Sequence, residues 1–342
     1  MKKILFLSLL ALLLGFSSPF QSGKELLTHN KVNIKDDYIG YPGQIIFFDD
    51  GFIGIEYDRN SPPLFYFIKN NHQFTSTHIG NRGQGPNSIT YVDNIQYLRK
   101  DIIGVFERNL SSYKEIFIYN NNTNNQKSVK FEGTYFKVLK LNHNQFVGLS
   151  SDSGMFHLVD SMGKIMNVFF EYPFRDKNEQ STSNSTRAMS YQGKIVVNPQ
   201  KNKLIYTTNF GEIIHFYSIE KDQIKLNSKI ENDYPIYEKI IINNNPITKL
   251  DFKKTTIGYI SLDASDKYLY ALYCGKKMDE LMAGMVMNNI GNQVRIFDLN
   301  GKLIRILQLD VPCMQICISS DEKRIWALAL IPEATLVYFD LE

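Results

Sequence analysis

The most distinctive chemistry in the sequence is a methionine cluster, formed by Met278, Met282, Met285 and Met287. Thioethers are soft ligands that could hold copper(I) in an oxidising compartment, and they also make adaptable apolar binding faces. Three of these residues, Met278, Met282 and Met285, follow the spacing of one helical face together with Leu281. We rank a buried helix face first, a partner-binding face second and copper third. The candidate ligand contacts in this segment are Lys276, Lys277, Met282 and Met285.

A second group is the glycine run Gly80, Gly83 and Gly85, which superficially matches a nucleotide-binding loop. That chemistry needs a helix N-terminus directly after the loop to receive the phosphate. Here Pro86 and a strand-like segment follow, so the pattern favours a turn. Two polar side chains would still project from this turn as candidate ligand contacts, namely Arg82 and Gln84.

Other nucleophiles and metal ligands show no short motif. None of the six histidines has a partner at metal-binding spacing, and no nucleophile elbow or Cys-His signature is present. Cys313 and Cys317 are four residues apart in a predicted strand, which places them about 13 Å apart, too far for a disulfide. We expect buried thiols at these positions and at Cys274, with one reactive thiol as the alternative.

The elements that would position these residues are repeated hairpins. The clearest is QVRIFDLNGKLIRILQLD (residues 293–310), where Asn300-Gly301 predicts a type I′ turn. Copies in register with Phe297 recur six times, at Phe67, Tyr119, Val159, Tyr217, Phe297 and Phe339. A different hairpin precedes each copy, again six times, aligned at Gly51, Asp101, Gln145, Lys203, Lys267 and Lys323. Two hairpins per repeat mean four strands, which is typical of a β-propeller.

We therefore predict an all-β, six-bladed β-propeller with four-stranded blades in one domain, residues 23–342. The blades are expected near residues 45–80, 92–132, 135–173, 190–231, 256–310 and 313–342. The last repeat has only three strands, so residues 24–34 are predicted to supply the outer strand and close the ring. Residues 176–190 are predicted as a surface loop. Residues 231–256 could hold an extra strand without a hairpin, which leaves a seventh blade as the less favoured alternative.

Several segments also resemble the TolB-like six-bladed propeller lipoproteins of Bacteroidetes. The C-terminal runs YLYALYCGKKMDE, VRIFDLNGKLIRILQLD and ISSDEKRIWALAL are similar to the last blades of that family. HIGNRGQGPNSI looks like its link between the first two blades, and YQGKIVVNPQKNKLIY like the start of its fourth. The resemblance covers nearly all of the mature chain and implies a fold and an envelope location. Its motifs are structural, and it implies no activity.

Oxygen ligands could converge on the axis of such a propeller. Some six-bladed propellers are calcium-dependent lactonases that use Glu, Asn and Asp of the innermost strands, and oxygen ligands suit Ca²⁺. The matching positions here are Asp93, Asn94, Asn198 and Asp263. Since Asn and Asp also begin turns throughout this chain, we favour structural roles for them. These four are metal candidates only if the protein is an enzyme.

The N-terminus predicts export. Lys2 and Lys3 precede an apolar run that is too short to span a bilayer, so residues 1–18 are predicted as a cleaved signal peptide. No other segment is predicted to span a membrane. Lipoprotein export needs a cysteine at the cleavage site, whereas Ser17-Ser18 is followed by Pro19, so no lipid anchor is predicted. We expect a periplasmic or extracellular protein, with peripheral association at the outer membrane as a further option.

The net charge and the lack of a catalytic motif narrow the possible classes of function. Loss of Lys2 and Lys3 with the leader lowers the formal net charge from +3 to +1, which argues against nucleic-acid binding. We therefore expect a non-catalytic binding or scaffold propeller of the bacterial cell envelope, without a cofactor. It would hold an envelope protein, peptide or glycan on its loop-rich face or in its axial channel. The alternative is a metal-assisted (Ca or Zn) lactonase or lyase with its site on the axis.

Overall fold

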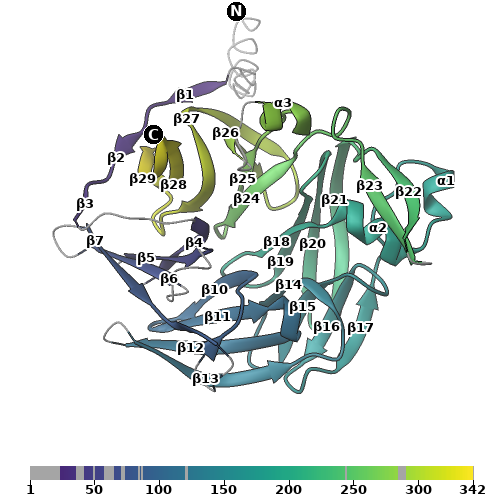
Figure 1. Ribbon diagram of the computed structural model, residues 1–342, viewed down its shortest axis with the longest axis horizontal. Helices are drawn as coiled ribbons and strands as arrows, with labels where there is room; N and C mark the ends of the chain where they lie inside the picture. The colour runs from purple at the N-terminus through teal and green to yellow at the C-terminus, as the bar shows by residue number, and fades with distance from the viewer. Residues whose placement is uncertain are drawn as a thin grey trace, which may run out of the picture.

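The computed structural model describes residues 24–35, 42–48, 51–57, 65–70, 74–83, 85, 88–119, 122–242, 245–283 and 290–341. Figure 1 shows β-sheets arranged around a common centre, with the small helices α1 and α3 at the periphery. The predicted signal peptide, residues 1–18, lies outside the described residues and stays a prediction.

Each of the first four units contains four antiparallel strands that follow one another in the chain. Unit 1 contains β4 (Pro42–Phe48), β5 (Gly51–Glu56), β6 (Phe65–Asn70) and β7 (Phe74–Ile79). Unit 2 contains β10 (Asn94–Arg99), β11 (Ile102–Glu107), β12 (Ser112–Tyr119) and β13 (Asn122–Lys130). Unit 3 contains β14 (Tyr135–Lys140), β15 (Gln145–Ser150), β16 (Phe156–Asp160) and β17 (Ile165–Phe169). Unit 4 contains β18 (Gly193–Val197), β19 (Lys203–Thr208), β20 (Glu212–Glu220) and β21 (Gln223–Asp233).

A further sheet has eight strands. It contains β24 (Tyr259–Ala264), β25 (Tyr268–Tyr273), β26 (Gly291–Asp298), β27 (Leu303–Ile318), β28 (Arg324–Ile331) and β29 (Glu333–Asp340). The first half of β27 pairs mainly with β26, while its second half pairs with β28. This strand is therefore the outer strand of unit 5 and the inner strand of unit 6, so the described sheets divide into six units.

The innermost strands of these units form a closed circle. Contacts run from β4 to β10, then to β14, β18 and β24, and from β24 through β27 back to β4. The strands on the outside of each sheet lie farther from the centre (Figure 1). This cyclic order confirms the predicted propeller.

The N-terminal segment lies along the outer edges of three units. β1 (Glu25–Leu27) runs parallel to β27, β2 (Asn30–Lys31) runs antiparallel to β29, and β3 (Ile34–Lys35) runs parallel to β7. Glu25 also forms an ion pair with Arg305, with Oε1 2.6 Å from Nη2. β2 is thus the fourth strand of unit 6, which confirms the predicted closure and gives β29 a partner for its open edge.

The hairpin between β26 and β27 differs from the predicted type I′ turn. That turn needs positive φ at both central residues, but only Gly301 of the Asn300-Gly301 pair has one, at 96°. The Asp298 carboxylate accepts from the main-chain N–H groups of Asn300 and Lys302, each at 2.9 Å, and so holds a wider turn. The same Asp-x-x-Gly-Lys turn joins β16 to β17, where Asp160 accepts from Met162 and Lys164.

The surface-loop prediction for residues 176–190 was wrong. This segment contains α1 (Lys177–Gln180) and α2 (Asn184–Tyr191), because Asp176 and Ser183 cap the two helices through their side chains. The Arg187 side chain is buried against them and donates to the main-chain oxygens of Gln180 and Thr182 at 2.8 and 2.9 Å. The polar composition hid a capped and packed helical pair.

The interval 231–256 also departs from the prediction, since it does contain a hairpin. β22 (Tyr237–Ile242) and β23 (Asn245–Leu250) pair antiparallel as a separate two-stranded sheet. β23 contacts α2, and the hairpin lies outside the ring (Figure 1). Two strands without a place in the circle of inner strands do not make a seventh unit.

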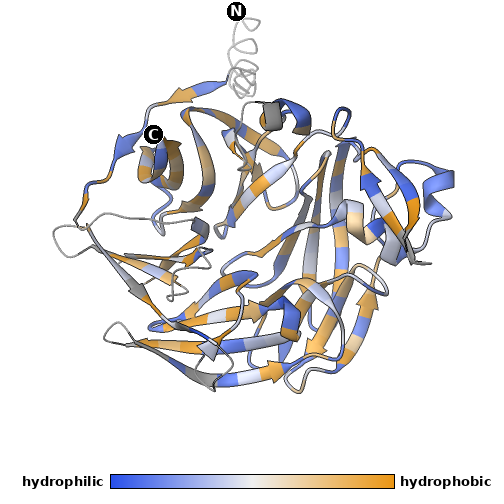
Figure 2. Ribbon diagram, viewed as in Figure 1, coloured by the Kyte–Doolittle hydropathy of each residue, from blue (hydrophilic) through white to orange (hydrophobic). Residues whose placement is uncertain are grey.

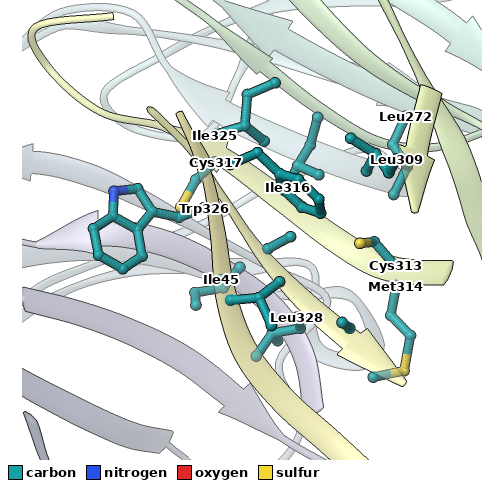
Figure 3. Close-up of a cluster of buried hydrophobic side chains, with 14 of the residues drawn as sticks. Ile45, Leu272, Leu309, Cys313, Met314, Ile316, Cys317, Ile325, Trp326 and Leu328 are labelled. Carbon is teal, nitrogen blue, oxygen red and sulfur yellow. The ribbon is translucent and has the colours of Figure 1, made fainter. Parts of the chain in front are cut away.

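Apolar residues run along the strands of every sheet, while α1 is hydrophilic (Figure 2). One large cluster fills the space between units 5, 6 and 1, and Figure 3 shows Cys317 within it beside Trp326, and Cys313 beside Met314. Burial raises the pKa of both thiols, which keeps them protonated. The prediction of buried, unpaired thiols is confirmed at these two positions, whereas Cys274 is half-buried.

Candidate functional site

A cavity of ≈ 390 Å³ lies on the propeller axis. Its wall comes from the beginnings of the inner strands, so every unit contributes to it. One lining residue from each unit, in chain order, is Gln44, Asn94, Lys137, Lys194, Leu262 and Gln315. Because adjacent inner strands converge here, residues far apart in the sequence face one space.

Three cationic side chains line this cavity, and they come from three consecutive units. Arg108 belongs to η1 (Arg108–Leu110) after β11, Lys137 to β14 and Lys194 to β18. The Arg108 guanidinium lies 4.7 Å from the centroid of the Phe136 ring. This cation–π contact joins unit 2 to unit 3. Positive charge is therefore gathered on one side of the axis.

The two ammonium groups have neutral hydrogen-bond acceptors. Lys137 donates to the main-chain oxygen of Asp93, and Lys194 donates to Oδ1 of Asn209 at 2.9 Å. Among the described residues, no ion pair within 4.0 Å involves either lysine. An ammonium has three N–H donors, so both lysines retain donors that could meet a ligand.

Burial lowers the pKa of both lysines. The pKa of Lys194 falls to about 7, first because its charge is desolvated and second because Lys137 repels it. The pKa of Lys137 falls to about 8 through desolvation, which Asp93 opposes and Arg108 reinforces. Perturbed pKa values of recessed groups in a cavity are a typical signature of functional sites.

Asp93 is the carboxylate on the cavity wall. Its Oδ2 accepts from the main-chain N–H of Arg108 at 2.8 Å, so it holds the start of η1 beside the cavity. Burial raises its pKa, and the hydrogen bond from Arg108 opposes that rise. With three cationic side chains against this one acid, the described wall carries surplus positive charge when the lysines are protonated.

Other polar side chains of the inner strands are engaged with neighbouring main chains. Gln44 accepts from Ile95 N at 2.9 Å, and Asn94 and Gln96 each bridge to β14. Ser261 accepts from Ile316 N at 3.1 Å, and Asp263 from Ile318 N at 2.8 Å. These side chains join adjacent inner strands and thus hold the circle together.

The four candidate metal ligands are separated by this arrangement. Asp93 and Asn94 line the cavity. Asp263 bonds the main chain of β27, and burial raises its pKa to about 6. Asn198 accepts from the main-chain N–H groups of Asn202 and Lys203 and so closes the turn before β19. Within the described ranges, no group of three or more His, Cys, Asp or Glu side chains is placed to hold a metal ion.

The described candidate contacts Arg82, Lys276 and Lys277 are not among the residues that line the cavity. Arg82 is on β8 (Asn81–Arg82), which pairs with β9 (Ser88–Ile89), and donates to the main-chain oxygen of Glu56 at 2.5 Å. Lys277 donates to the main-chain oxygen of Lys254 at 2.6 Å, whereas Lys276 is exposed. Gln84 and Met285 lie outside the described residues, and of Met282 only its place in α3 is described.

The methionine-bearing insert does contain a helix, α3 (Met278–Ala283). Leu281 is buried in the large cluster and Met278 packs against it. For these two residues, the prediction of a buried helix face is confirmed. Met287 lies outside the described residues.

The closed circle of four-stranded units defines the protein as a β-propeller. Comparison with known families narrows this class, because the model of the TolB-like 6-blade propeller-like family matches residues 20–321. The chain belongs to this family.

Two solved structures are similar to this chain. A Bacteroides fragilis NCTC 9343 protein described as a "Putative exported protein" aligns over 92% of this chain and 94% of its own, with 14% identity and a TM-score of 0.56. The β-propeller domain of Myceliophthora thermophila Cps50 (Swd1) aligns over 92% and 100%, with 12% identity and a TM-score of 0.47. The first of these likenesses shows the fold alone. No curated protein matches the sequence significantly. Among the described residues, no helix is long and apolar enough to cross a membrane.

Sequence reasoning missed the cavity lysines. Lys137 and Lys194 lie in the apolar strand runs YFKVLK and GKIVV, where a lysine interrupts inner-strand sequence. That interruption is the signal that could have singled them out. It was hidden because lysine is frequent in the solvated turns of this chain and because the overall charge is close to neutral.

Proposed function

We propose that the protein is a non-catalytic binding propeller of the bacterial cell envelope, and that the axial cavity is its ligand site. The observation that carries this proposal is the pair of recessed lysines, whose ammonium groups face the cavity with only neutral acceptors among the described residues. Charged groups held in this way cost folding free energy. Ligand binding is a function that would justify the cost.

The size and composition of the cavity support this proposal. A volume of ≈ 390 Å³ lies within the range of about 300–1,000 Å³ that is usual for small-molecule sites. The wall combines apolar side chains such as Leu262 and Met314 with a few converging polar groups. An envelope location is supported by the family and by the description of the Bacteroides fragilis protein. The ligand would be a small molecule or the end of a peptide or glycan.

A blocking variant tests the proposal. A panel of small acids, amines, sugars and short peptides would be screened by calorimetry against the wild type, Leu262→Trp and Ile241→Trp. Leu262→Trp places an indole in the cavity, whereas Ile241 is 76% exposed on β22 and serves as the matched control. We expect ligands that bind the wild type and Ile241→Trp but not Leu262→Trp. Circular dichroism and melting curves would check that the variants fold.

Two results would contradict the proposal. Ligands that bind all three proteins equally would place the site elsewhere. Chemical conversion of a bound ligand, detected by mass spectrometry and dependent on added Ca²⁺ or Zn²⁺, would favour the alternative of a lactonase or lyase that uses Asp93 and Asn94.

A further inference from the structure

The two sides of the axial cavity differ in chemistry. Units 2, 3 and 4 contribute the cationic side chains Arg108, Lys137 and Lys194. Units 5 and 6 contribute no charged side chain to the described wall; theirs are Ile260, Leu262 and Met314, together with the polar Ser261 and Gln315. A ligand that matches both sides would have an anionic end and a largely apolar, uncharged body.

From this division we infer that the cavity binds an amphipathic anion, with its carboxylate or phosphate group between Lys137 and Lys194 and its apolar body against units 5 and 6. This inference rests on the proposed function and names the ligand class of the same site. Lys137 and Lys194 are on adjacent inner strands, β14 and β18, which contact each other. They are also close enough for each to repel the charge of the other. One oxyanion between them would relieve that repulsion and accept hydrogen bonds from both.

The described contacts of Lys137 and Lys194 do not include a negatively charged acceptor, so a bound anion could supply one. Asn209, which follows β19 in unit 4, accepts from Lys194, and its amide is neutral. Lys137 is anchored by the main chain of Asp93, which orients its ammonium without neutralising it. The Asp93 carboxylate is engaged by the main-chain N–H of Arg108. The wall therefore orients positive charge and supplies little compensation for it.

The apolar side of the cavity is suited to a short hydrocarbon body. Met314 is almost completely buried, and Leu262 is half-buried beside the open space. Burying a ligand's methylene groups there is favourable, because it removes apolar surface from water. The polar side chains on the same strands, Ser261 and Asp263, are already bonded to β27 and do not offer a second charged site.

The test uses matched probes and the full chain. Hexanoate and hexyl phosphate carry the proposed anion and apolar body, hexanamide lacks the charge, and acetate lacks the body. Binding would be measured by calorimetry at pH 6.5. We expect hexanoate or hexyl phosphate to bind at least about tenfold more tightly than hexanamide or acetate. The tighter of the two anions identifies the preferred head group.

Lysine variants locate the anion. Lys194→Met and Lys137→Met should each weaken hexanoate binding about 10- to 100-fold, because each removes a charged hydrogen bond. Lys225→Met is the control, since Lys225 is an exposed lysine of unit 4 paired with Glu220. It should leave binding unchanged. A short peptide with a free C-terminal carboxylate, compared with its amidated form, tells whether the anion can be supplied by a peptide end.

Several outcomes would overturn this inference. Equal binding of hexanoate and hexanamide would show that the ligand needs no charge. Equal losses of hexanoate affinity in Lys194→Met and Lys225→Met would show that the cavity lysines do not bind the anion. Binding of neither anion at millimolar concentration would also reject it. A neutral ligand that binds the wild type but not Leu262→Trp would contradict the inference of an anionic ligand and would still support the proposed binding function. Anions that bind the wild type and Leu262→Trp equally would reject both.

Discussion

The inner strands of units 5 and 4 place polar side chains near the same axis but use them differently. On β24, Ser261 and Asp263 accept hydrogen bonds from the main chain of β27 at 3.1 and 2.8 Å. On β18, Lys194 lines the cavity and donates to one neutral amide oxygen. The first pair completes the hydrogen bonding of a neighbouring strand. The lysine carries a charge for which the described residues provide no ion-pair partner.

This difference separates polar residues that maintain the fold from those available to a ligand. An acceptor bonded to a buried N–H stabilises the protein, because its loss would leave that N–H unsatisfied. A desolvated charge without a counter-charge has the opposite effect on stability. Substitutions on the two strands should therefore change stability in opposite directions.

The largest effect is expected for Asp263→Ala. It removes the acceptor of Ile318 N and Ala264 N, and we expect the free energy of unfolding to fall by about 2–3 kcal/mol. Urea unfolding would measure it. Asp266→Ala is the control, because Asp266 is exposed in the turn that follows β24 and should change stability by less than about 0.5 kcal/mol. Equal stability of the two variants would show that the bonds to β27 do not support the ring.

Lys194→Met is expected to change the free energy of unfolding in the opposite direction. Replacing a desolvated ammonium by an apolar side chain of similar length should raise the free energy of unfolding by about 1–2 kcal/mol at pH 6. The folded-state pKa of about 7 lies below the ordinary 10.5, so the unfolded chain binds more protons between these values. Stability of the wild type therefore rises with pH across that window, and the advantage of the variant should shrink by pH 9. A destabilised Lys194→Met protein would contradict this account.

A third effect concerns ligand binding and pH. Lys194 and Lys137, with pKa values of about 7 and 8, lose their charges as the pH rises, while Arg108 remains charged. The other titratable groups on the wall are Asp93, whose pKa is raised by burial, and Tyr57, whose pKa is raised well above 10. Hexanoate affinity should fall severalfold between pH 6.5 and pH 9. An affinity that does not change over this range would show that hexanoate binding does not depend on the charges of these two lysines.

The smallest effect is expected for Asn209→Ala. It removes the 2.9 Å acceptor that orients the Lys194 ammonium, and we expect hexanoate binding to weaken by about two- to fivefold with little change in stability. Calorimetry and a melting curve would measure both. Asn227→Ala is a suitable control, because Asn227 is an exposed amide of unit 4 that bonds Ser218. A loss as large as that of Lys194→Met would mean that Asn209 contacts the ligand itself.

Much of the fold could be predicted because it depends on patterns of residues that are close together in the sequence. The hairpin repeats, the long apolar strands and the three-stranded last repeat each predicted a unit, a boundary or the closing strand. The turn at Asn300-Gly301 was misjudged because the Asp298 side chain, rather than the dipeptide, sets its geometry. The helices at 177–191 were missed because their caps are short polar motifs without an apolar period.

The candidate site was less predictable for a different physical reason. Asp263 and Asn94 were chosen by residue type, yet an acceptor that bonds a neighbouring strand and one that faces a ligand look alike in sequence. Lys137 and Lys194 were overlooked because solvation, which decides the meaning of a lysine, depends on strands more than forty residues away in the chain. Distances between units, and not residue identities, carry that information.

The strand pairing of the N-terminal segment has a consequence for how the molecule folds. Asn30 pairs with Tyr338, so the bond that completes unit 6 joins residues roughly 300 positions apart. Closing so long a loop is slow, and β29 keeps an unpaired edge until both segments are present. The last event in folding is therefore expected to be the docking of β2, and a nascent chain cannot complete its ring before Tyr338 has been synthesised.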